Sequence, residues 1–255
     1  MERNHAQNLL NLVKIISSDF PTLEVKSIIE LGARDCEETI SLNHFYPQAQ
    51  LFTFECNPEK LEQCRSNIKE LKHVKLIEKA VSNKKGTVDF FQIDKVNTVT
   101  TWEDGNPGAS SLFEASGKYT VEQYAQKKIQ VVCTTLYDEI QAKNVLNADL
   151  MWMDIQGSEL NALKGMKEHL KDVSIIHTEV EFMEIYKGEP LFWEVKKFLQ
   201  ENGFYLGYFT SFYKNLSADA VFINQDLLSK NWFKKQKYAL KHKLLQPLYH
   251  YGVYK

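Results

Sequence analysis

The sequence lacks the features that would tie the protein to a membrane, to secretion or to nucleic acid. No apolar run approaches the roughly 20 residues that a membrane-spanning helix needs. The chain starts without an apolar stretch behind a basic end, so we expect no signal peptide and a cytoplasmic location. The formal net charge is −2, which gives no general attraction to nucleic acid, and we expect no nucleic-acid partner.

Cysteine and glycine are too sparse for several common kinds of site. The four cysteines, Cys36, Cys56, Cys64 and Cys133, include no pair with the CxxC spacing of a metal or redox motif. We expect them to be reduced thiols. The turn at 32–36 holds one glycine, so it lacks the G-x-G-x-x-G of a dinucleotide-binding turn, and G-x-x-x-x-G-K-[ST] is also absent. These gaps disfavour a cofactor that carries phosphate groups.

What is present predicts an α/β fold. The chain has 255 residues, of which 44% are hydrophobic, enough for one sizeable core. Strand-like and helix-like patterns alternate over residues 25–225, which is typical of a mostly parallel central sheet with helices on both faces. The last strand-like runs, 204–210 and 220–223, predict a terminal antiparallel pair. A helical extension is expected over 1–24, and 226–255 form a tail.

Two strand ends in the first part of the chain predict a cofactor pocket. Residues 27–31 form an apolar run that leads into Gly32, and residues 50–55 form a second run that ends at Glu55. A glycine lets a ligand approach the backbone, and an acid after the next strand can accept hydrogen bonds from a ribose diol. Acids that would repel a pyrophosphate surround the turn: Glu30, Asp35, Glu37 and Glu38. S-adenosylmethionine, a sulfonium nucleoside without phosphate, fits these strand ends better.

Short motifs spread over residues 25–225 resemble those of the FkbM-type S-adenosylmethionine-dependent methyltransferases. The most specific are Phe54-Glu55-Cys56-Asn57-Pro58 and Met153-Asp154-Ile155-Gln156-Gly157-Ser158-Glu159-Leu160. Further matching segments are 29–34, 80–82, 110–112, 134–138, 179–182 and 186–192. The resemblance implies a class I, Rossmann-like methyltransferase domain over 25–225 with S-adenosylmethionine as its cofactor.

The resemblance also implies which residues contact the cofactor. Gly32 would line it, Glu55 would hold the ribose hydroxyls, and Asp154 would face the methionine end and the acceptor. Val81 would lie near the adenine. The full expected set is Glu30, Gly32, Ala33, Arg34, Glu55, Cys56, Ala80, Val81 and Asp154. The family usually has a glycine where this chain has Cys36, and a side chain there narrows the turn.

Members of the family methylate hydroxyl oxygens, often on sugars or secondary metabolites. The acceptor expected here is therefore a small molecule or a glycan, with contacts from Ser110, Ser111, Gln156 and Tyr186. Residues 94–126 form a loop too long to be idle in a compact domain, and we expect it to cover the active site. Aromatic residues that would stack on a sugar, or else pack in the core, are Trp102, Phe113, Tyr119, Tyr186 and Phe192.

Methyl transfer to a hydroxyl also needs a group that removes the hydroxyl proton. The candidate bases are Asp154, His177 and Glu179, and a buried, hydrogen-bonded histidine is the alternative for His177. Asp154, Glu179 and Glu181 could instead hold Mg²⁺, which would lower the pKa of the hydroxyl. Ser158 opens a helix, where capping is the plainer role.

The tail over 226–255 is basic and amphipathic, with lysines among large apolar residues. It predicts peripheral contact with an anionic membrane surface or a glycolipid, or else packing on the domain or on a second copy in a homodimer. Two other functions stay open from the sequence. One is a non-catalytic binding or scaffold subunit of a glycan-assembly complex. The other is a nucleotide-dependent oxidoreductase, which the missing second glycine of the turn disfavours.

Overall fold

The centre of the molecule is a twisted sheet of seven strands. The computed structural model describes residues 5–214, 216–229, 236 and 238. Within them, the strand order of this sheet is β3-β2-β1-β7-β8-β10-β9. The strands are β1 (Ser27–Leu31), β2 (Gln50–Phe54), β3 (Val74–Ile77), β7 (Leu150–Met153), β8 (Ile175–Glu181), β9 (Phe204–Tyr213) and β10 (Ser217–Asn224). Strands β3 to β8 in this order are parallel, and β10 is antiparallel to both of its neighbours, which confirms the predicted fold class.

The central position of β1, β7 and β8 follows from their composition. All residues of these three strands are buried, as expected for apolar runs that are covered on both faces. Ile29 of β1 pairs with Phe52 of β2 on one side and with Met151 of β7 on the other. This register brings the carboxyl ends of β1, β2 and β7 to one edge of the sheet, where ligands of such folds bind.

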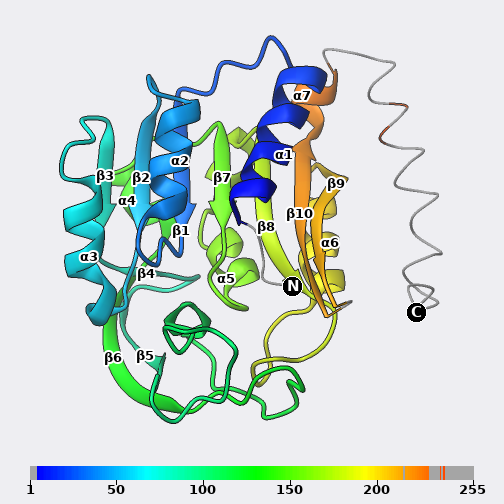
Figure 1. Ribbon diagram of the computed structural model, residues 1–255. Helices are drawn as coiled ribbons and strands as arrows, with labels where there is room; N and C mark the ends of the chain where they lie inside the picture. The colour runs from blue at the N-terminus through cyan, green and yellow to red at the C-terminus, as the bar shows by residue number, and fades with distance from the viewer. Residues whose placement is uncertain (1–4, 215, 230–235, 237, 239–255) are drawn as a thin grey trace.

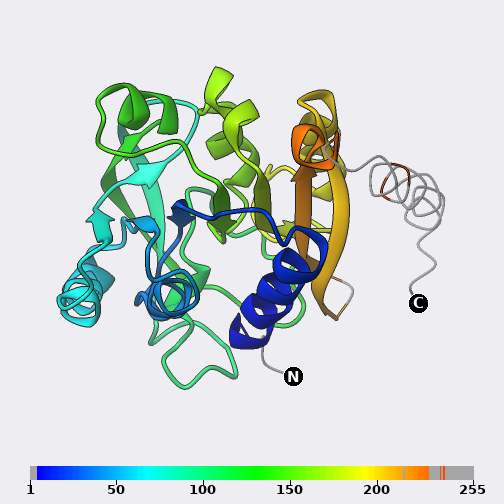
Figure 2. The ribbon, with the colours of Figure 1, turned by 90° about the horizontal axis from the view of Figure 1, so that it is seen from above.

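Helices cover both faces of the sheet (Figure 2). One layer holds α1 (His5–Asp19), α2 (Glu37–Phe45) and α3 (Pro58–Ile68), and the other holds α4 (Leu136–Gln141), α5 (Glu159–Lys164) and α6 (Phe192–Glu201). Leu12 of α1 and Leu42 of α2 pack in the first interface, and Leu163 of α5 and Phe192 of α6 pack in the second. Each core therefore depends on the amphipathic spacing that the sequence shows.

A small second sheet lies beside the carboxyl edge of the main sheet (Figure 1). Its strands are β4 (Ala80–Val81), β6 (Gln126–Thr134) and β5 (Gly86–Ile93), in that order. Residues 94–125 leave from β5, contain the short 3₁₀ helix η1 (Pro107–Ala109), and return to β6. Isolated bridges tie this excursion down, including Phe91 to Ser111 and Ala115 to Tyr186. The segment predicted to cover the active site is thus held at the expected edge.

The remaining two helices among the described residues are short. A 3₁₀ helix η2 (Lys167–Asp172) follows α5, and α7 (Gln225–Ser229) follows β10. All four cysteines are free thiols. In the part of the chain that the structure describes, no helix combines the length and apolarity needed to cross a membrane. The predicted membrane or dimer contact of the tail falls mostly on residues outside the described ones.

Candidate active site

Two adjoining pockets open at the carboxyl edge of the sheet. The first encloses about 610 Å³, including space open to solvent, and lies between the ends of β1, β2 and β7 and the small sheet. The second encloses about 1180 Å³ and is bounded by the 94–125 excursion and by the ends of β7 and β8. Both pockets are lined by Gly32, Arg34, Gly108, Asp154 and Gln156. The two pockets therefore adjoin along these five residues, which form their shared wall.

Gly32 is required by backbone packing at the turn after β1. Its φ is +85°, and a Cβ at this position would lie 1.8 Å from the main-chain oxygen of Asp154. The N–H groups of Gly32 and Ala33 both donate to the carbonyl of Phe54, at 3.0 and 3.1 Å. Only a glycine therefore fits here, because the ends of β1, β2 and β7 come together at this residue. The backbone packing alone requires it, whether or not a ligand approaches.

Glu55 points into the first pocket and joins the two strand ends that the sequence singled out. Its Oε2 accepts a hydrogen bond from the N–H of Arg34 at 2.7 Å, and its Oε1 accepts from the N–H groups of Cys56 and Asn57 at 2.8 and 2.7 Å. Burial raises the pKa of Glu55, and the three N–H groups oppose that rise. A carboxylate has about four lone-pair positions, so one acceptor position remains for a ligand.

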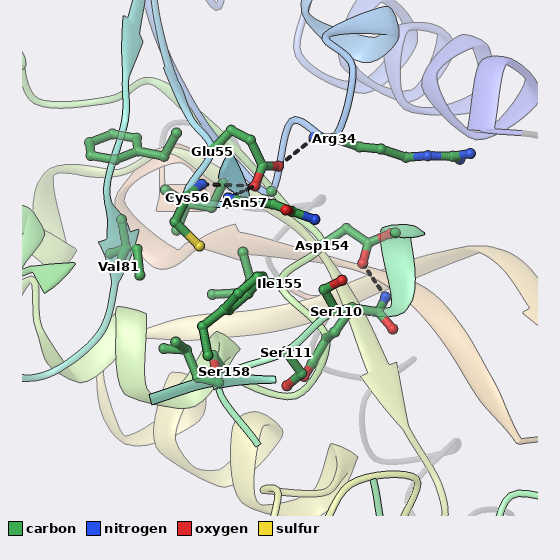
Figure 3. A pocket seen from close by; sticks show the side chains of 18 of the residues that line it. Arg34, Glu55, Cys56, Asn57, Val81, Ser110, Ser111, Asp154, Ile155 and Ser158 are labelled. Atoms are coloured by element: carbon green, nitrogen blue, oxygen red, sulfur yellow. Dashed lines mark hydrogen bonds between the residues drawn. The ribbon is translucent and has the colours of Figure 1, made fainter. Parts of the chain in front are cut away.

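One end of the first pocket is apolar. Figure 3 shows Val81, Cys56 and Ile155 around this end, with Ser158 below them, while Asp154 lies toward the opposite end. Burial raises the pKa of the Cys56 thiol well above its ordinary value, so the thiol stays protonated and apolar. A flat aromatic group with polar edges matches such a slot.

Arg34 connects the β1 turn with the 94–125 excursion. Its guanidinium lies 2.6 Å from the carboxylate of Asp104 and 5.3 Å from the ring centroid of Trp102. The residue has a left-handed φ of 53°. The positive charge is thus paired within the protein and braces the wall between the two pockets.

Gln156 links the acids at the ends of β7 and β8. Its Nε2 donates to Oδ1 of Asp154 at 2.6 Å and to Oε2 of Glu179 at 2.7 Å. Two carboxylates this close would repel each other, and the amide N–H groups between them offset that repulsion. The main-chain carbonyl of Gln156 accepts a hydrogen bond of 2.6 Å from Ser111, which fixes the residue to the excursion.

Tyr186 holds the amide of Gln156 from behind. Its hydroxyl lies 2.8 Å from Oε1 of Gln156 and 2.8 Å from the carbonyl oxygen of Ala109 in η1. Tyr186 is fully buried, and burial raises its pKa well above the ordinary value, so the hydroxyl keeps its proton as a donor. The N–H groups of Ile185 and Tyr186 both donate to Oε1 of Glu189. The acid pair is therefore supported by a chain of buried contacts.

Among the residues it describes, the structure does not show the predicted Mg²⁺ site. The described residues contain no group of three His, Cys, Asp or Glu side chains placed to hold a metal ion. The amide nitrogen of Gln156 lies between the carboxylates of Asp154 and Glu179 and donates to both. Glu181, the third predicted ligand, lines neither pocket. Two of the three predicted ligands thus already accept hydrogen bonds from an amide, and we derive no metal-dependent step.

Several other predicted site residues lie away from the pockets. His177 is buried, stacks on Trp152 with ring centroids 3.9 Å apart, and has Nε2 3.0 Å from Oγ1 of Thr210. This is the buried, hydrogen-bonded histidine that the sequence left as the alternative. Glu30 is buried behind the turn and accepts hydrogen bonds from Thr39 and Thr53. The predicted residues that line neither pocket are Glu30, Ala33, His177, Tyr186 and Glu181.

The remaining predicted residues come together. The first pocket is lined by Gly32, Arg34, Glu55, Cys56, Ala80, Val81, Ser110, Ser111, Asp154 and Gln156. Glu179 lines the second pocket. Of the predicted aromatic residues, Trp102 and Tyr119 line the second pocket, whereas Phe192 is buried in the core. Sequence reasoning missed Glu122 and Tyr124 in the second pocket and Ile155 in the first, although Ile155 lies within the motif that was recognised.

A family comparison fits this arrangement. A model described as the methyltransferase FkbM domain matches residues 35–206, more than half of the chain. The chain belongs to the FkbM methyltransferase family. The match begins three residues after Gly32, covers Glu55 and the Asp154–Gln156 segment, and ends in β9. It therefore includes most of both pockets.

A named relative of this FkbM chain is the 2-O-methyltransferase NoeI of Sinorhizobium fredii. The two are 29% identical over 164 residues, which cover 64% of this chain and 66% of that protein, slightly less than two thirds of its length. Among solved structures, the fibrillarin pre-rRNA processing protein of Methanococcus jannaschii matches at 13% identity and a TM-score of 0.49, covering 81% of this chain and 69% of that chain. The magnesium protoporphyrin IX methyltransferase of Synechocystis matches at 11% identity and a TM-score of 0.46, covering 86% and 79%. These two structural similarities add nothing to the fold that the strand order shows.

Proposed function

We propose that the protein transfers a methyl group from S-adenosylmethionine to a hydroxyl oxygen, with a sugar of a glycan, glycolipid or secondary metabolite as the acceptor. The observation that carries this proposal is the wall shared by the two pockets, with Asp154 lining both. A methyl donor in one pocket and an acceptor in the other would meet at this wall, as an in-line displacement requires.

The first pocket would hold the cofactor. The remaining acceptor position of Glu55 would take a ribose hydroxyl, and the slot beside Val81 and Cys56 would take the adenine. The methionine end would then run past Gly32 toward Asp154. The acids around the turn suit a ligand that carries a sulfonium and an amino group.

The second pocket would hold the acceptor. Trp102, Tyr119 and Tyr124 supply aromatic surfaces, and the rings of Tyr119 and Tyr124 lie 5.7 Å apart. Glu122, which accepts a 2.7 Å hydrogen bond from the hydroxyl of Tyr124, adds a polar group to the same wall. Aromatic faces with a few fixed polar groups are the usual lining for a ligand such as a sugar. The family relative named a 2-O-methyltransferase supports oxygen as the accepting atom.

The reaction would proceed with Asp154 as the general base. The hydroxyl oxygen attacks the methyl carbon, the carbon–sulfur bond breaks with its electron pair going to sulfur, and the hydroxyl proton passes to the carboxylate. The products are a methyl ether, S-adenosylhomocysteine and one proton. The amide of Gln156, held by Tyr186, keeps the carboxylate of Asp154 turned toward the shared wall.

Titration calorimetry with S-adenosylhomocysteine and with NAD tests the cofactor. We expect one site for S-adenosylhomocysteine and none for NAD; the reverse result, or no binding of either, would contradict the proposal and favour an oxidoreductase or a scaffold subunit. A second assay follows a labelled methyl group into sugar acceptors. An alkali-stable ether supports methylation of a hydroxyl, whereas label in an ester or an amine contradicts it.

A further inference from the structure

Three serines line the first pocket, and their hydroxyls differ in what they bind. Oγ of Ser110 accepts from the N–H of Ile93 at 3.0 Å and donates to a carbonyl. Oγ of Ser111 accepts from the N–H of Phe113 and donates to the carbonyl of Gln156. Oγ of Ser158 has no hydrogen-bond partner, although the residue is only 1% exposed. A buried hydroxyl without a partner costs free energy, so this one calls for a partner that the protein alone does not supply.

The helix that follows does not account for Ser158. The residue precedes α5, where the sequence pattern predicted a capping role, but its side chain makes no capping hydrogen bond. Its main-chain carbonyl accepts a hydrogen bond from the N–H of Ala162 at 3.0 Å, which is the first hydrogen bond of the helix. Ser158 therefore contributes to the helix through its backbone and not through its hydroxyl. The predicted capping role of Ser158 is therefore wrong, and its buried hydroxyl is left without a partner in a residue that lines the first pocket.

The surroundings of Ser158 define what could pair with it. Figure 3 places the side chain below Ile155, at the apolar end of the pocket, with Val81 and Cys56 opposite. A planar base between such walls keeps its polar groups at its edge, where a single hydroxyl can donate to a ring nitrogen or accept from an amino group. Glu55, which would hold the ribose, lines the same pocket.

We propose that Ser158 is a cofactor-specificity residue whose hydroxyl makes a hydrogen bond to the edge of the adenine ring. This proposal rests on the proposed function, because the adenine belongs to the cofactor assigned there. The hydroxyl distinguishes adenine from a base that lacks the contacted group, because an unmatched base would leave Oγ buried without a partner.

The test is calorimetry of wild type and Ser158→Ala with S-adenosylhomocysteine and with a series of analogues, each lacking one hydrogen-bonding group of the base. We expect Ser158→Ala to fold as stably as wild type, because it removes a hydroxyl that has no partner in the free protein. It should bind S-adenosylhomocysteine about tenfold more weakly. For the one analogue that lacks the contacted group, both proteins should bind equally.

Ser27→Ala is the matched control. Oγ of Ser27 is also buried without a partner, but it lies at the amino end of β1, away from both pockets, so its loss should leave every affinity unchanged. Equal binding of S-adenosylhomocysteine by wild type and Ser158→Ala, or the same loss with every analogue, would overturn the Ser158 proposal alone. Failure of the wild type to bind S-adenosylhomocysteine would overturn the proposed function and the Ser158 proposal with it.

Discussion

The two pockets are built in different ways although they share a wall. In the first pocket the key carboxylate, that of Glu55, is held by three main-chain N–H groups of the strand ends. In the second pocket the carboxylate of Glu179 is held by a side chain, Gln156, which in turn depends on Tyr186. The cofactor side thus follows from the path of the backbone, whereas the acceptor side depends on side chains from distant segments. Changes on the two sides should therefore affect different steps.

We expect Asp154→Asn to separate cofactor binding from methyl transfer most strongly. The change removes the proposed proton acceptor and keeps the size of the side chain, so kcat should fall by about 10²–10⁴-fold. The affinity for S-adenosylhomocysteine, measured by calorimetry, should fall far less than kcat, although Asp154 also lines the cofactor pocket. A variant that retains wild-type kcat would exclude Asp154 as the base.

A change on the cofactor side should instead lower the affinity for the cofactor and leave the KM for the acceptor unchanged. Glu55→Ala removes the proposed ribose acceptor, and we expect the affinity for S-adenosylhomocysteine to fall by about tenfold to a hundredfold. Glu55→Gln keeps one oxygen as an acceptor and should lose less. The KM for the acceptor should change little in both variants. If it changes as much as the cofactor affinity does, the division into two separate sides is wrong.

The contrast between the pockets also explains what the sequence could predict. Gly32 and Glu55 were found because strand ends and turns follow local rules that a single segment of chain displays. His177 lines neither pocket, because alternation along a strand tells which residues share a face, not whether that face meets a pocket. The resemblance implied Glu30 at the cofactor, whereas its buried carboxylate accepts hydrogen bonds from Thr39 and Thr53. Glu122 and Tyr124 gave no signal, since their place depends on how the 94–125 excursion returns to the sheet. The unpaired hydroxyl of Ser158 could not be predicted either, because hydrogen-bond partners depend on how the chain packs.

A smaller effect is expected from Tyr186→Phe. The change removes the hydroxyl that orients the Gln156 amide, so kcat should fall about tenfold while the affinity for S-adenosylhomocysteine stays unchanged. Tyr46→Phe is a matched control, because the Tyr46 hydroxyl is buried without a partner and lines neither pocket. A loss of cofactor affinity in Tyr186→Phe would show that the supporting chain serves both pockets.

A buried acid that belongs to neither pocket should affect stability and not activity. Burial raises the pKa of Glu30 from 4.5 to about 8, so the folded protein binds one more proton than the unfolded chain between these pH values. Stability is then lost as pH rises through this window, by at most about 1.4 kcal/mol per pH unit. Glu30→Gln cannot ionise, so urea unfolding of this variant should show a weaker decline between pH 5 and pH 8 than wild type. An identical decline of stability in both proteins would contradict the raised pKa of Glu30.

The division between the two pockets is tested most directly by a crystal structure of the protein with S-adenosylhomocysteine. We expect the ribose hydroxyls on the carboxylate of Glu55, the adenine between Val81 and Ile155, and the sulfur directed at the wall that contains Asp154. A ligand seated among the aromatic residues of the second pocket, or a ribose that does not touch Glu55, would contradict it.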